Sequence, residues 1–412
     1  MSFQQGLSGL AAAATALDVI GNNISNSGTV GFKGASTNFS SVYAASQGLA
    51  GTSQTGIGVG VSAIQQNFTQ GNVTVTNNPL DLALNGDGFF RVSQGGAVSY
   101  TRSGQFHADE NGYVINDQNA RLTGYPVTAN GLISPSNPVE LQLSVTAIQP
   151  RATSDPLAGN LTAVLNLDAR DAAPAATFDP LDPATYTFAT ALSVFDTLGV
   201  AHTLSTYFVT KAPATSGSWD VHATLDGANP LPTTPGQLTF DSSGILTAGS
   251  MQTLPSWTLT NGAGTLAPGI MDFTGTTQFG SQASVNRLSQ GGYTAGSLVG
   301  VGVGSDGIIN GRYSNGQTLN MGQVVVANFA NPRGLLNIGN NQWTLTTASG
   351  PELIGAPGSG SRGVIQSAAL EESNVDLTKE LVDMITAQRN YQANAETIKT
   401  QDQILQSLLN LR

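Results

Sequence analysis

The stretch FQQGLSGLAAAATALDVIGNNI, residues 3–24, constrains the fold of the whole chain. Positions separated by alternating steps of four and three residues lie on one stripe of an α-helix, which is the heptad pattern of coiled coils. In this stretch the stripe consists of Phe3, Leu7, Leu10, Ala14, Leu17, Gly21 and Ile24. Because an isolated helix of this length is only marginally stable in water, the stretch predicts a helix that needs a partner.

A second heptad stripe lies at the opposite end of the chain, in the stretch LTKELVDMITAQRNYQANAETIKTQDQILQSLL, residues 377–409. It consists of Leu377, Leu381, Met384, Gln388, Tyr391, Ala395, Ile398, Asp402, Leu405 and Leu409. Ser373 and Asp376 just before it have the spacing of a helix capping box. Ser2 and Gln5 have the same spacing at the first helix. The sequence therefore predicts two long, capped terminal helices that form a coiled-coil-like core.

The chain between the two stripes has a different composition. All 18 prolines lie between Pro79 and Pro357, and short apolar runs there alternate with Asn-Gly and Asp-Gly dipeptides. These dipeptides favour tight hairpins, so the middle of the chain is predicted to form antiparallel β domains. The expected fold class is a multidomain, mainly β protein flanked by long N- and C-terminal α-helices.

The composition also predicts the domain boundaries. A length of 412 residues corresponds to two to four domains. We expect a terminal helical core over 1–25 and 370–412, an extended connector over 26–78 and 355–369, an inner β domain over 79–145 and 284–354, and an inserted outer β domain over 146–283. The insertion is placed where the chain is rich in proline and the flanking pattern is interrupted.

The charge of the chain argues against two classes of partner. Only 10% of the residues are charged, the net charge is −11, and four of the residues are lysines. Nucleic acids and anionic membranes are bound by clusters of Lys and Arg, so neither is an expected partner. No run of about 18 apolar residues occurs, so we expect no membrane insertion. The chain has no cysteine, which excludes disulfides and thiol chemistry.

The residues that usually carry catalysis or metal binding do not form a recognisable site. His107, His202 and His222 lack a neighbouring set of ligands, so we expect them at the surface. The carboxylate pairs at 109–110 and 371–372 point apart on a strand or helix and are interpreted as turn and solvated residues. We therefore predict no catalytic residue, no metal and no cofactor, and we expect the protein not to be an enzyme.

The sharpest motif follows the first stripe and reads NNISNSGTVGFK, residues 22–33. Asn22 and Asn23 close the helix, and the triplet Gly31, Phe32 and Lys33 follows after a polar turn. From the residues alone, this is either a helix stop followed by a core Phe and a surface Lys, or a segment that packs against other chains. The motif resembles the N-terminal signature of the bacterial flagellar axial proteins, which include rod, hook and hook-associated proteins.

Two more stretches carry the same resemblance. Residues 381–402 are similar to the C-terminal end of this family, and the segments 80–91 and 100–106 resemble the β domain that its longer members share. The length of the chain and the insertion at 146–283 favour a hook member over a shorter distal rod protein.

The resemblance implies a structural subunit that polymerises into a flexible helical tube, a universal joint that transmits motor torque to the filament. It makes the apolar residues of both stripes the expected assembly contacts. It also implies that the partners are further copies of the chain, a rod protein, a hook-associated junction protein, the hook cap and the flagellar type III export apparatus. The expected location is the extracellular hook. No Lys or Arg precedes Lys33, so we expect export without a cleaved signal peptide.

Two alternatives stay open at this point. A distal rod or hook-associated axial protein belongs to the same family and differs in its position along the axis. A monomeric extracellular β-rich adhesin or enzyme is the alternative from another class, with its terminal helices in an ordinary intramolecular hairpin.

Overall fold

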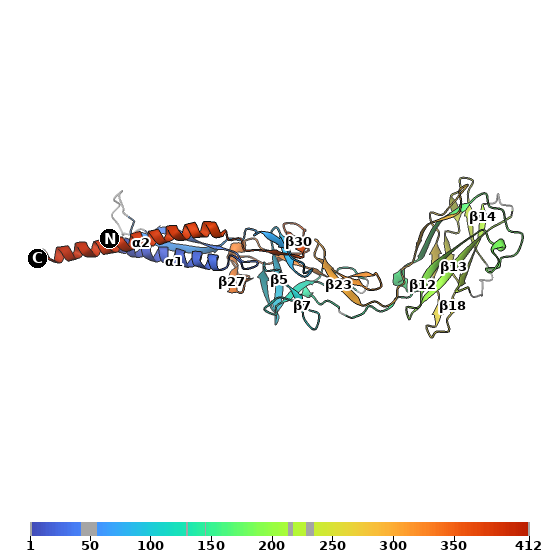
Figure 1. Ribbon diagram of the computed structural model, residues 1–412, viewed down its shortest axis with the longest axis horizontal. Helices are drawn as coiled ribbons and strands as arrows, with labels where there is room; N and C mark the ends of the chain where they lie inside the picture. The colour runs from blue at the N-terminus through green and yellow to red at the C-terminus, as the bar shows by residue number, and fades with distance from the viewer. Residues whose placement is uncertain are drawn as a thin grey trace. The chain divides into compact units, whose positions relative to one another are not determined.

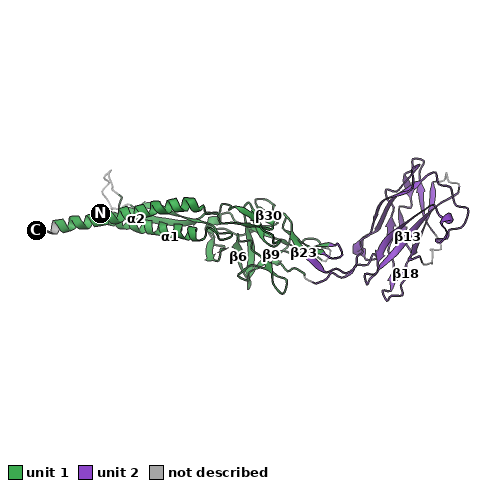
Figure 2. Cartoon of the chain, in the orientation of Figure 1, with its two compact units in different colours: residues 1–144, 300–312, 318–412 green, residues 145–299, 313–317 purple. Residues whose placement is uncertain are grey.

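The structure is a computed structural model that describes residues 2–42, 56–128, 131–144, 146–212, 217–227 and 235–410. The chain divides into two compact units (Figure 2). Unit 1 comprises Met1–Ser144, Gly300–Arg312 and Thr318–Arg412, and unit 2 comprises Val145–Val299 and Tyr313–Gln317. The insertion predicted over 146–283 thus lies inside unit 2, which also includes 284–299. Its independence as a domain stays a prediction.

Both terminal helices belong to unit 1. Helix α1 covers Ser2–Ser25 and helix α2 covers Leu377–Asn410, and the two lie side by side (Figure 1). They run antiparallel, because Gly6 faces Ile398 while Asn23 donates a hydrogen bond to Glu380 at the other end. A Cβ atom at Gly6 would lie 3.0 Å from Ile398 Cγ1, and one at Gly9 would lie 2.5 Å from Asn394 Oδ1. Small residues on α1 therefore leave room for the Ile398 and Asn394 side chains of α2.

The large residues of the predicted stripes lie mostly outside this contact. Exposed members are Phe3 at 48%, Leu7 at 53%, Leu377 at 45%, Leu381 at 45%, Tyr391 at 37% and Leu405 at 54%. Half-buried members are Leu10, Leu17, Ile24, Met384, Ala395 and Ile398, of which Ile398 contacts α1 at Gly6. The side chain of Leu409 lies outside the described residues. Within the single chain, the contact between the helices thus uses a face of α1 that the heptad pattern did not select.

The predicted capping boxes are wrong in their details. Helix α2 begins one turn later than predicted, and Asp376 is its N-cap, since Asp376 Oδ1 accepts hydrogen bonds from the amides of Thr378 (2.9 Å) and Lys379 (3.2 Å). Ser373 Oγ instead accepts from the amide of Val375. At the first helix, the Gln5 side chain donates to the carbonyl of Gly56 rather than folding back on the helix start.

The connector pairs the outgoing and returning segments of the chain. Strands β1 (Ala35–Val42) and β2 (Gly58–Gln66) form an antiparallel hairpin that packs on α1. Further on, β3 (Val73–Val75) pairs with β31 (Ala369–Glu371), and β4 (Leu82–Asn85) pairs with β30 (Val364–Ser367). The segment that leaves α1 and the segment that leads to α2 are thus held together by strand pairing.

The β domain of unit 1 is built on one large sheet, in which β23, β24, β25, β9, β5, β6, β28 and β27 follow one another. The strands of this sheet are β5 (Phe89–Gln94), β6 (Ala97–Thr101), β7 (His107–Ala108), β8 (Val114–Ile115), β9 (Arg121–Tyr125), β10 (Val139–Glu140), β23 (Leu298–Val303), β24 (Ile308–Tyr313), β25 (Thr318–Val324), β26 (Val326–Asn328), β27 (Leu336–Gly339), β28 (Gln342–Thr344) and β29 (Leu353–Gly355). The 3₁₀ turn η4 covers Pro332–Gly334. Phe68 of the connector packs edge-to-face on Phe89 and Trp343, with ring centroids 5.5 Å apart in both pairs. This aromatic contact fixes the connector on the sheet.

Unit 2 is a sandwich of two sheets. One sheet contains β11 (Leu161–Asp168), β17 (Met251–Thr253), β20 (Ile270–Asp272), β21 (Thr277–Phe279) and β22 (Ser284–Ser289). The other contains β12 (Phe188–Phe195), β13 (Ala201–Thr210), β14 (Ser218–Leu225), β15 (Gly236–Phe240) and β16 (Leu246–Ala248). Smaller elements are η1 (Pro156–Ala158), η2 (Pro183–Thr185), β18 (Trp257–Thr258) and β19 (Thr265–Leu266). Leu165, Phe208, Trp219 and Phe273 are fully buried in its core.

Two features of unit 2 were not expected. Most strand pairs of the chain are antiparallel as predicted, but β11 pairs in parallel with β20 and β21. The two segments that enter and leave the unit lie side by side, because Ile148 bridges to Gly296 and Arg151 bridges to Tyr293. The unit therefore begins and ends at one place.

The prediction that all three histidines lie at the surface is right for His107 and wrong for His202. The His202 side chain is 11% exposed and lies between Asp226 (Nδ1 to Oδ2, 2.7 Å) and Asp196 (Nε2 to Oδ2, 3.3 Å). His222 is half-buried and stacks on Phe178, with ring centroids 4.1 Å apart. In the described part of the chain, no group of three His, Asp or Glu side chains could hold a metal ion.

The His202 contacts predict a pH-dependent stability. Burial lowers the pKa of His202, but hydrogen bonds to Asp226 and Asp196 outweigh it and raise the pKa above its ordinary value of 6.5. A raised pKa means that the stabilisation is complete below about pH 6.5 and is lost as the pH rises through the raised value. Calorimetry of the full chain should show unfolding of unit 2 at lower temperature at pH 9 than at pH 6. His202→Gln should flatten this dependence, whereas exposed His107→Gln should leave it intact; equal slopes in both variants would contradict the assignment.

Candidate functional site

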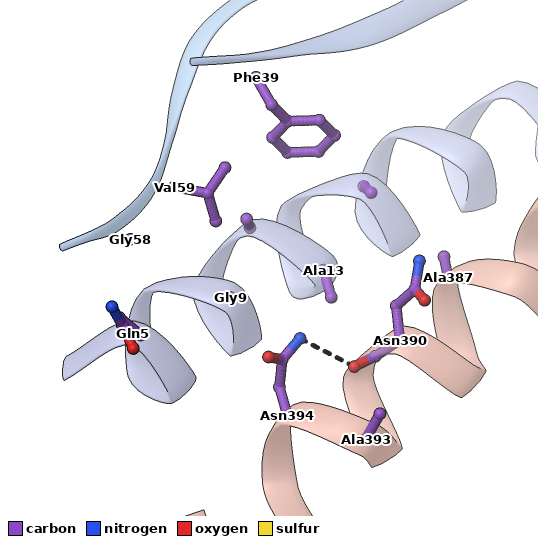
Figure 3. Close-up of a pocket in the computed structure, with 12 residues that line it drawn as sticks. Gln5, Gly9, Ala13, Phe39, Gly58, Val59, Ala387, Asn390, Ala393 and Asn394 are labelled. Carbon is purple, nitrogen blue, oxygen red and sulfur yellow. Dashed lines mark hydrogen bonds between the residues drawn. The ribbon is translucent and has the colours of Figure 1, made fainter. Parts of the chain in front are cut away.

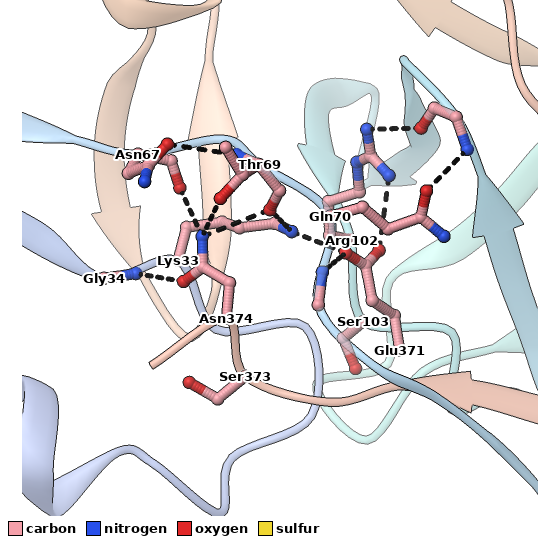
Figure 4. Close-up of polar contacts among 12 residues, drawn as sticks. Lys33, Gly34, Asn67, Thr69, Gln70, Arg102, Ser103, Glu371, Ser373 and Asn374 are labelled. Atoms are coloured by element: carbon pink, nitrogen blue, oxygen red, sulfur yellow. Dashed lines mark hydrogen bonds and ion pairs between the residues drawn. The ribbon is translucent and has the colours of Figure 1, made fainter. Parts of the chain in front are cut away.

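The triplet that the sequence singled out leads to a buried cluster of charges in unit 1. Glu371, the last residue of β31, accepts a hydrogen bond from Lys33 Nζ on one carboxylate oxygen (2.6 Å) and from Arg102 Nη1 on the other (3.2 Å) (Figure 4). The side chains of Lys33 and Glu371 are 0% exposed, and that of Arg102 is 3% exposed. We call these three residues the Glu371 cluster. They come from the segment after α1, from the β domain and from the segment before α2.

Backbone groups complete the coordination of the Glu371 cluster. The amide of Gly71 donates to Glu371 Oε1 (2.8 Å), Lys33 Nζ donates to the carbonyl of Thr69 (2.8 Å), and Arg102 Nη2 donates to the carbonyl of Gly86 (2.9 Å). Two cations share one carboxylate in a site without access to solvent. Burial is the main cause that lowers the pKa of both Lys33 and Arg102, and Glu371 opposes it in each case. The carboxylate is therefore the group on which both buried cations depend.

Gly31 is required by the backbone beside the cluster. Its φ is +69°, in the left-handed region that favours glycine, and a Cβ atom there would collide with the backbone of Ser103. Its amide donates to the carbonyl of Glu371 (2.7 Å). Phe32 is half-buried between these two anchored residues. The Gly-Phe-Lys triplet thus combines a backbone contact and a side-chain contact to the same residue, Glu371.

Two asparagines attach the helices to the connector. Asn23 is buried and bonds the backbone of Ala35 through both its amide nitrogen (2.8 Å) and its oxygen (2.9 Å), and it also donates to Glu380 of α2 (3.2 Å). Asn374 accepts from the amide of Gly34 (2.8 Å) and donates to the carbonyl of Asn67 (2.8 Å). Asn22, its neighbour in the motif, is exposed. The asparagines hold α1, the β1–β2 hairpin and the start of α2 in one arrangement.

The sequence located only part of this site. The interpretation of Glu371 as a solvated residue is wrong, and so is the alternative that put Lys33 at the surface, because both side chains are fully buried. Arg102 and Asn374 were not identified as site residues. One sequence feature could have indicated that Glu371 is buried. Only 10% of the residues are charged, and Glu371 directly follows the apolar residues Ala369 and Leu370 in a short strand.

The arrangement of these contacts has a mechanical consequence. The Glu371 cluster and the two asparagines connect both helices, the connector and the β domain through hydrogen bonds, of which those from Lys33 and Arg102 to Glu371 are buried. Force applied to the helices would reach the β domain through these contacts. No helix in the described part of the chain is long and apolar enough to cross a membrane.

Comparison with protein-family models finds four matches along the chain. Residues 3–33 match the flagella basal body rod protein family, and residues 83–149 match the flagellar hook protein FlgE/F/G D1 domain. Residues 166–293 match the flagellar basal body protein FlaE D2 domain. Residues 366–411 match the flagellar basal body rod FlgEFG protein C-terminal family. The matched segments include the motif that ends at Lys33, the strand that ends in Glu371, and most of unit 2.

Comparison with known proteins gives relatives that match over their whole length. The chain is 43% identical over 420 residues to the flagellar hook protein FlgE of Salmonella typhimurium, with 100% of both chains covered. It is 41% identical over 418 residues to flagellar hook protein FlgE of Escherichia coli K12, again with 100% of both covered. Among solved structures, the Helicobacter pylori flagellar hook protein FlgE2 has a similar fold, with a TM-score of 0.52 at 12% identity over 71% of this chain and 99% of that chain.

The Glu371 cluster predicts a large difference between two adjacent glutamates. Glu371→Gln leaves two buried cations without a carboxylate, which should destabilise unit 1 by about 3–5 kcal/mol. Glu372 is exposed, and its carboxylate accepts a long hydrogen bond from the Asn72 side chain (3.4 Å), so Glu372→Gln should change the free energy of unfolding by less than about 0.5 kcal/mol. Denaturant titration of both variants measures the difference. Equal stability of the two variants would show that the cluster does not support the fold.

Proposed function

Because the chain belongs to the flagellar hook protein family and is a structural subunit of the bacterial flagellar hook, we propose that the exposed stripes of its terminal helices are the contacts through which it polymerises. The prediction of a hook subunit is confirmed by relatives that match from end to end. That match favours the hook over a distal rod or hook-associated protein, and over a monomeric adhesin or enzyme. The family is one of structural proteins.

The observation that carries the proposal is the division of α1 into two faces. One face, with Gly6 and Gly9, packs against α2 of the same chain, whereas Phe3 and Leu7 are about half exposed on another face. On α2, Leu377 and Leu381 are exposed in the same way. Burying a large apolar side chain contributes about 1.5–3 kcal/mol, so contacts with neighbouring subunits would stabilise the helices considerably.

These contacts can build a tube if they join one surface of a subunit to a different surface of the next subunit. A head-to-tail interface that does not close into a ring generates an open helical filament. In such a filament the terminal helices would form the cohesive inner part, and the low-charge β units would move against their neighbours as the tube bends. The Glu371 cluster would then transmit torque between the helices and the β domain of each subunit.

The assignment to the hook also suggests which other flagellar proteins the subunit contacts. We propose that the subunit contacts a rod protein at one end of the hook and a hook-associated junction protein at the other, with the hook cap present during assembly. We also propose that it reaches the extracellular hook through the flagellar type III export apparatus without cleavage of a signal peptide.

A charge placed in the exposed stripe should prevent assembly without unfolding the subunit. Leu7→Glu and Leu381→Glu put a carboxylate where a neighbouring helix would bury a leucine, so tubes should be absent from electron micrographs. Calorimetric unfolding of the β units should change little, since both side chains are exposed in the single chain. Gln4→Glu adds the same charge at an exposed polar position and is the control. Normal tubes from the two leucine variants would contradict the assignment of the stripes.

The proposed export route predicts an intact N-terminal region in the extracellular protein. Mass spectrometry of hooks detached from cells should detect peptides that include Phe3 and Leu7. A mature chain that starts near residue 20 or 30 would instead indicate a cleaved signal and reject the route.

A further inference from the structure

A groove lies between the two terminal helices and the β1–β2 hairpin. It has a volume of about 600 Å³, and Phe39 and Val59 of the hairpin project over α1 on one side while Ala387 and Ala393 of α2 line the other (Figure 3). Its α1 side consists of small residues such as Ala13. None of the described residues that line it is charged. The groove is thus suited to an uncharged segment with apolar side chains.

The groove extends further along the helices. A second hollow of about 290 Å³ shares Ala16, Phe39, Ala387 and Asn390 with the first. This second part has charged residues, Lys379 and Asp383 among them, on its α2 side. The first hollow is therefore the one suited to apolar side chains, and the second continues from it toward the start of α2.

The last turns of α2 have no counterpart on α1. Since Gly6 faces Ile398 and the helices are antiparallel, α2 continues past the first residue of α1, as Figure 1 shows at the C-terminal end. Ile404 and Leu405 in this overhang are 47% and 54% exposed. The overhang, residues 402–410, is about 13 Å long at 1.5 Å per residue. Its sequence contains one charged residue, Asp402.

We propose that the groove of one subunit holds the overhang of a second copy of this chain. The inference deepens the proposed function, on which it rests, by assigning a specific interface within the polymer. Groove and overhang match in chemistry, because the groove would bury the apolar Ile404 and Leu405, while Asp402 at the start of the overhang stays outside it. The side-chain amides of Asn390 and Asn394, which line the groove, can form hydrogen bonds with Gln403 or Gln406 of the neighbour's overhang.

The two surfaces are different parts of one molecule, so the contact repeats from copy to copy. Each subunit offers a groove at residues 387–394 of α2 and an overhang centred near residue 406. With a rise of 1.5 Å per residue, neighbouring subunits in this contact would be displaced along the helix axis by about 23 Å. Such a displaced, non-closing contact adds subunits without limit and is compatible with a tube.

The absence of cysteine makes disulfide crosslinking a clean test. The double variant Val59→Cys/Leu405→Cys in the full chain should form a ladder of covalent multimers on oxidation of its tubes, because each subunit links forward and backward. Either single variant can yield dimers at most. The double variant should yield at least ten-fold more trimer and higher species than Val59→Cys/Val75→Cys, in which exposed Val75 of β3 serves as the control position.

The outcomes separate this inference from the proposed function. Tubes without a ladder would overturn the groove assignment and leave polymerisation intact, whereas a failure of the unsubstituted chain to form tubes would overturn the proposed function. If the cysteine variants fail to assemble, a helical reconstruction of unsubstituted tubes identifies the occupant directly. Density of a neighbour's residues 402–410 in the groove supports the inference, and an empty groove or a different segment there rejects it.

Discussion

The ion pairs of Glu371 with Lys33 and Arg102 are the interaction on which the rest of unit 1 depends. Charges taken out of water cost several kcal/mol each unless their partners are in place. The three residues are separated by long stretches of chain, so the cost is offset only when the segment after α1, the β domain and the segment before α2 come together. This makes the cluster selective for one arrangement. A misplaced connector would leave at least one charge buried without a partner.

The two helices show a different balance of forces. Gly6 and Gly9 on α1 leave room for the Ile398 and Asn394 side chains of α2, but they contribute little apolar area to the contact. The large side chains Phe3 and Leu7 are left for other contacts. A subunit built in this way has a weakly stabilised pair of helices when alone and a strong reason to associate, because association buries the area that the intrachain contact leaves exposed.

Much of the architecture could be predicted from the sequence, because it follows from local patterns. Heptad periodicity predicted both helices, and Asn-Gly and Asp-Gly turns predicted the β domains between them. The face of α1 that contacts α2 could not be predicted in this way. Helix α1 has one stripe of large residues and one of small residues, and which of them contacts α2 depends on the side chains that α2 presents. Glu371 was misinterpreted for a related reason. Its burial depends on Lys33 and Arg102, which are distant in sequence, and no local pattern reports a distant counter-charge. The parallel pairing of β11 with β20 and β21 likewise depends on long-range topology.

The bridges Ile148 to Gly296 and Arg151 to Tyr293 place the entry and exit of unit 2 next to each other. A polypeptide can be inserted into another domain without disturbing it when its two ends lie close together. We therefore expect that unit 2 can be enlarged, shortened or exchanged while the host sheet keeps its strand register. The size and surface of unit 2 could then change without any change to the helices or the Glu371 cluster.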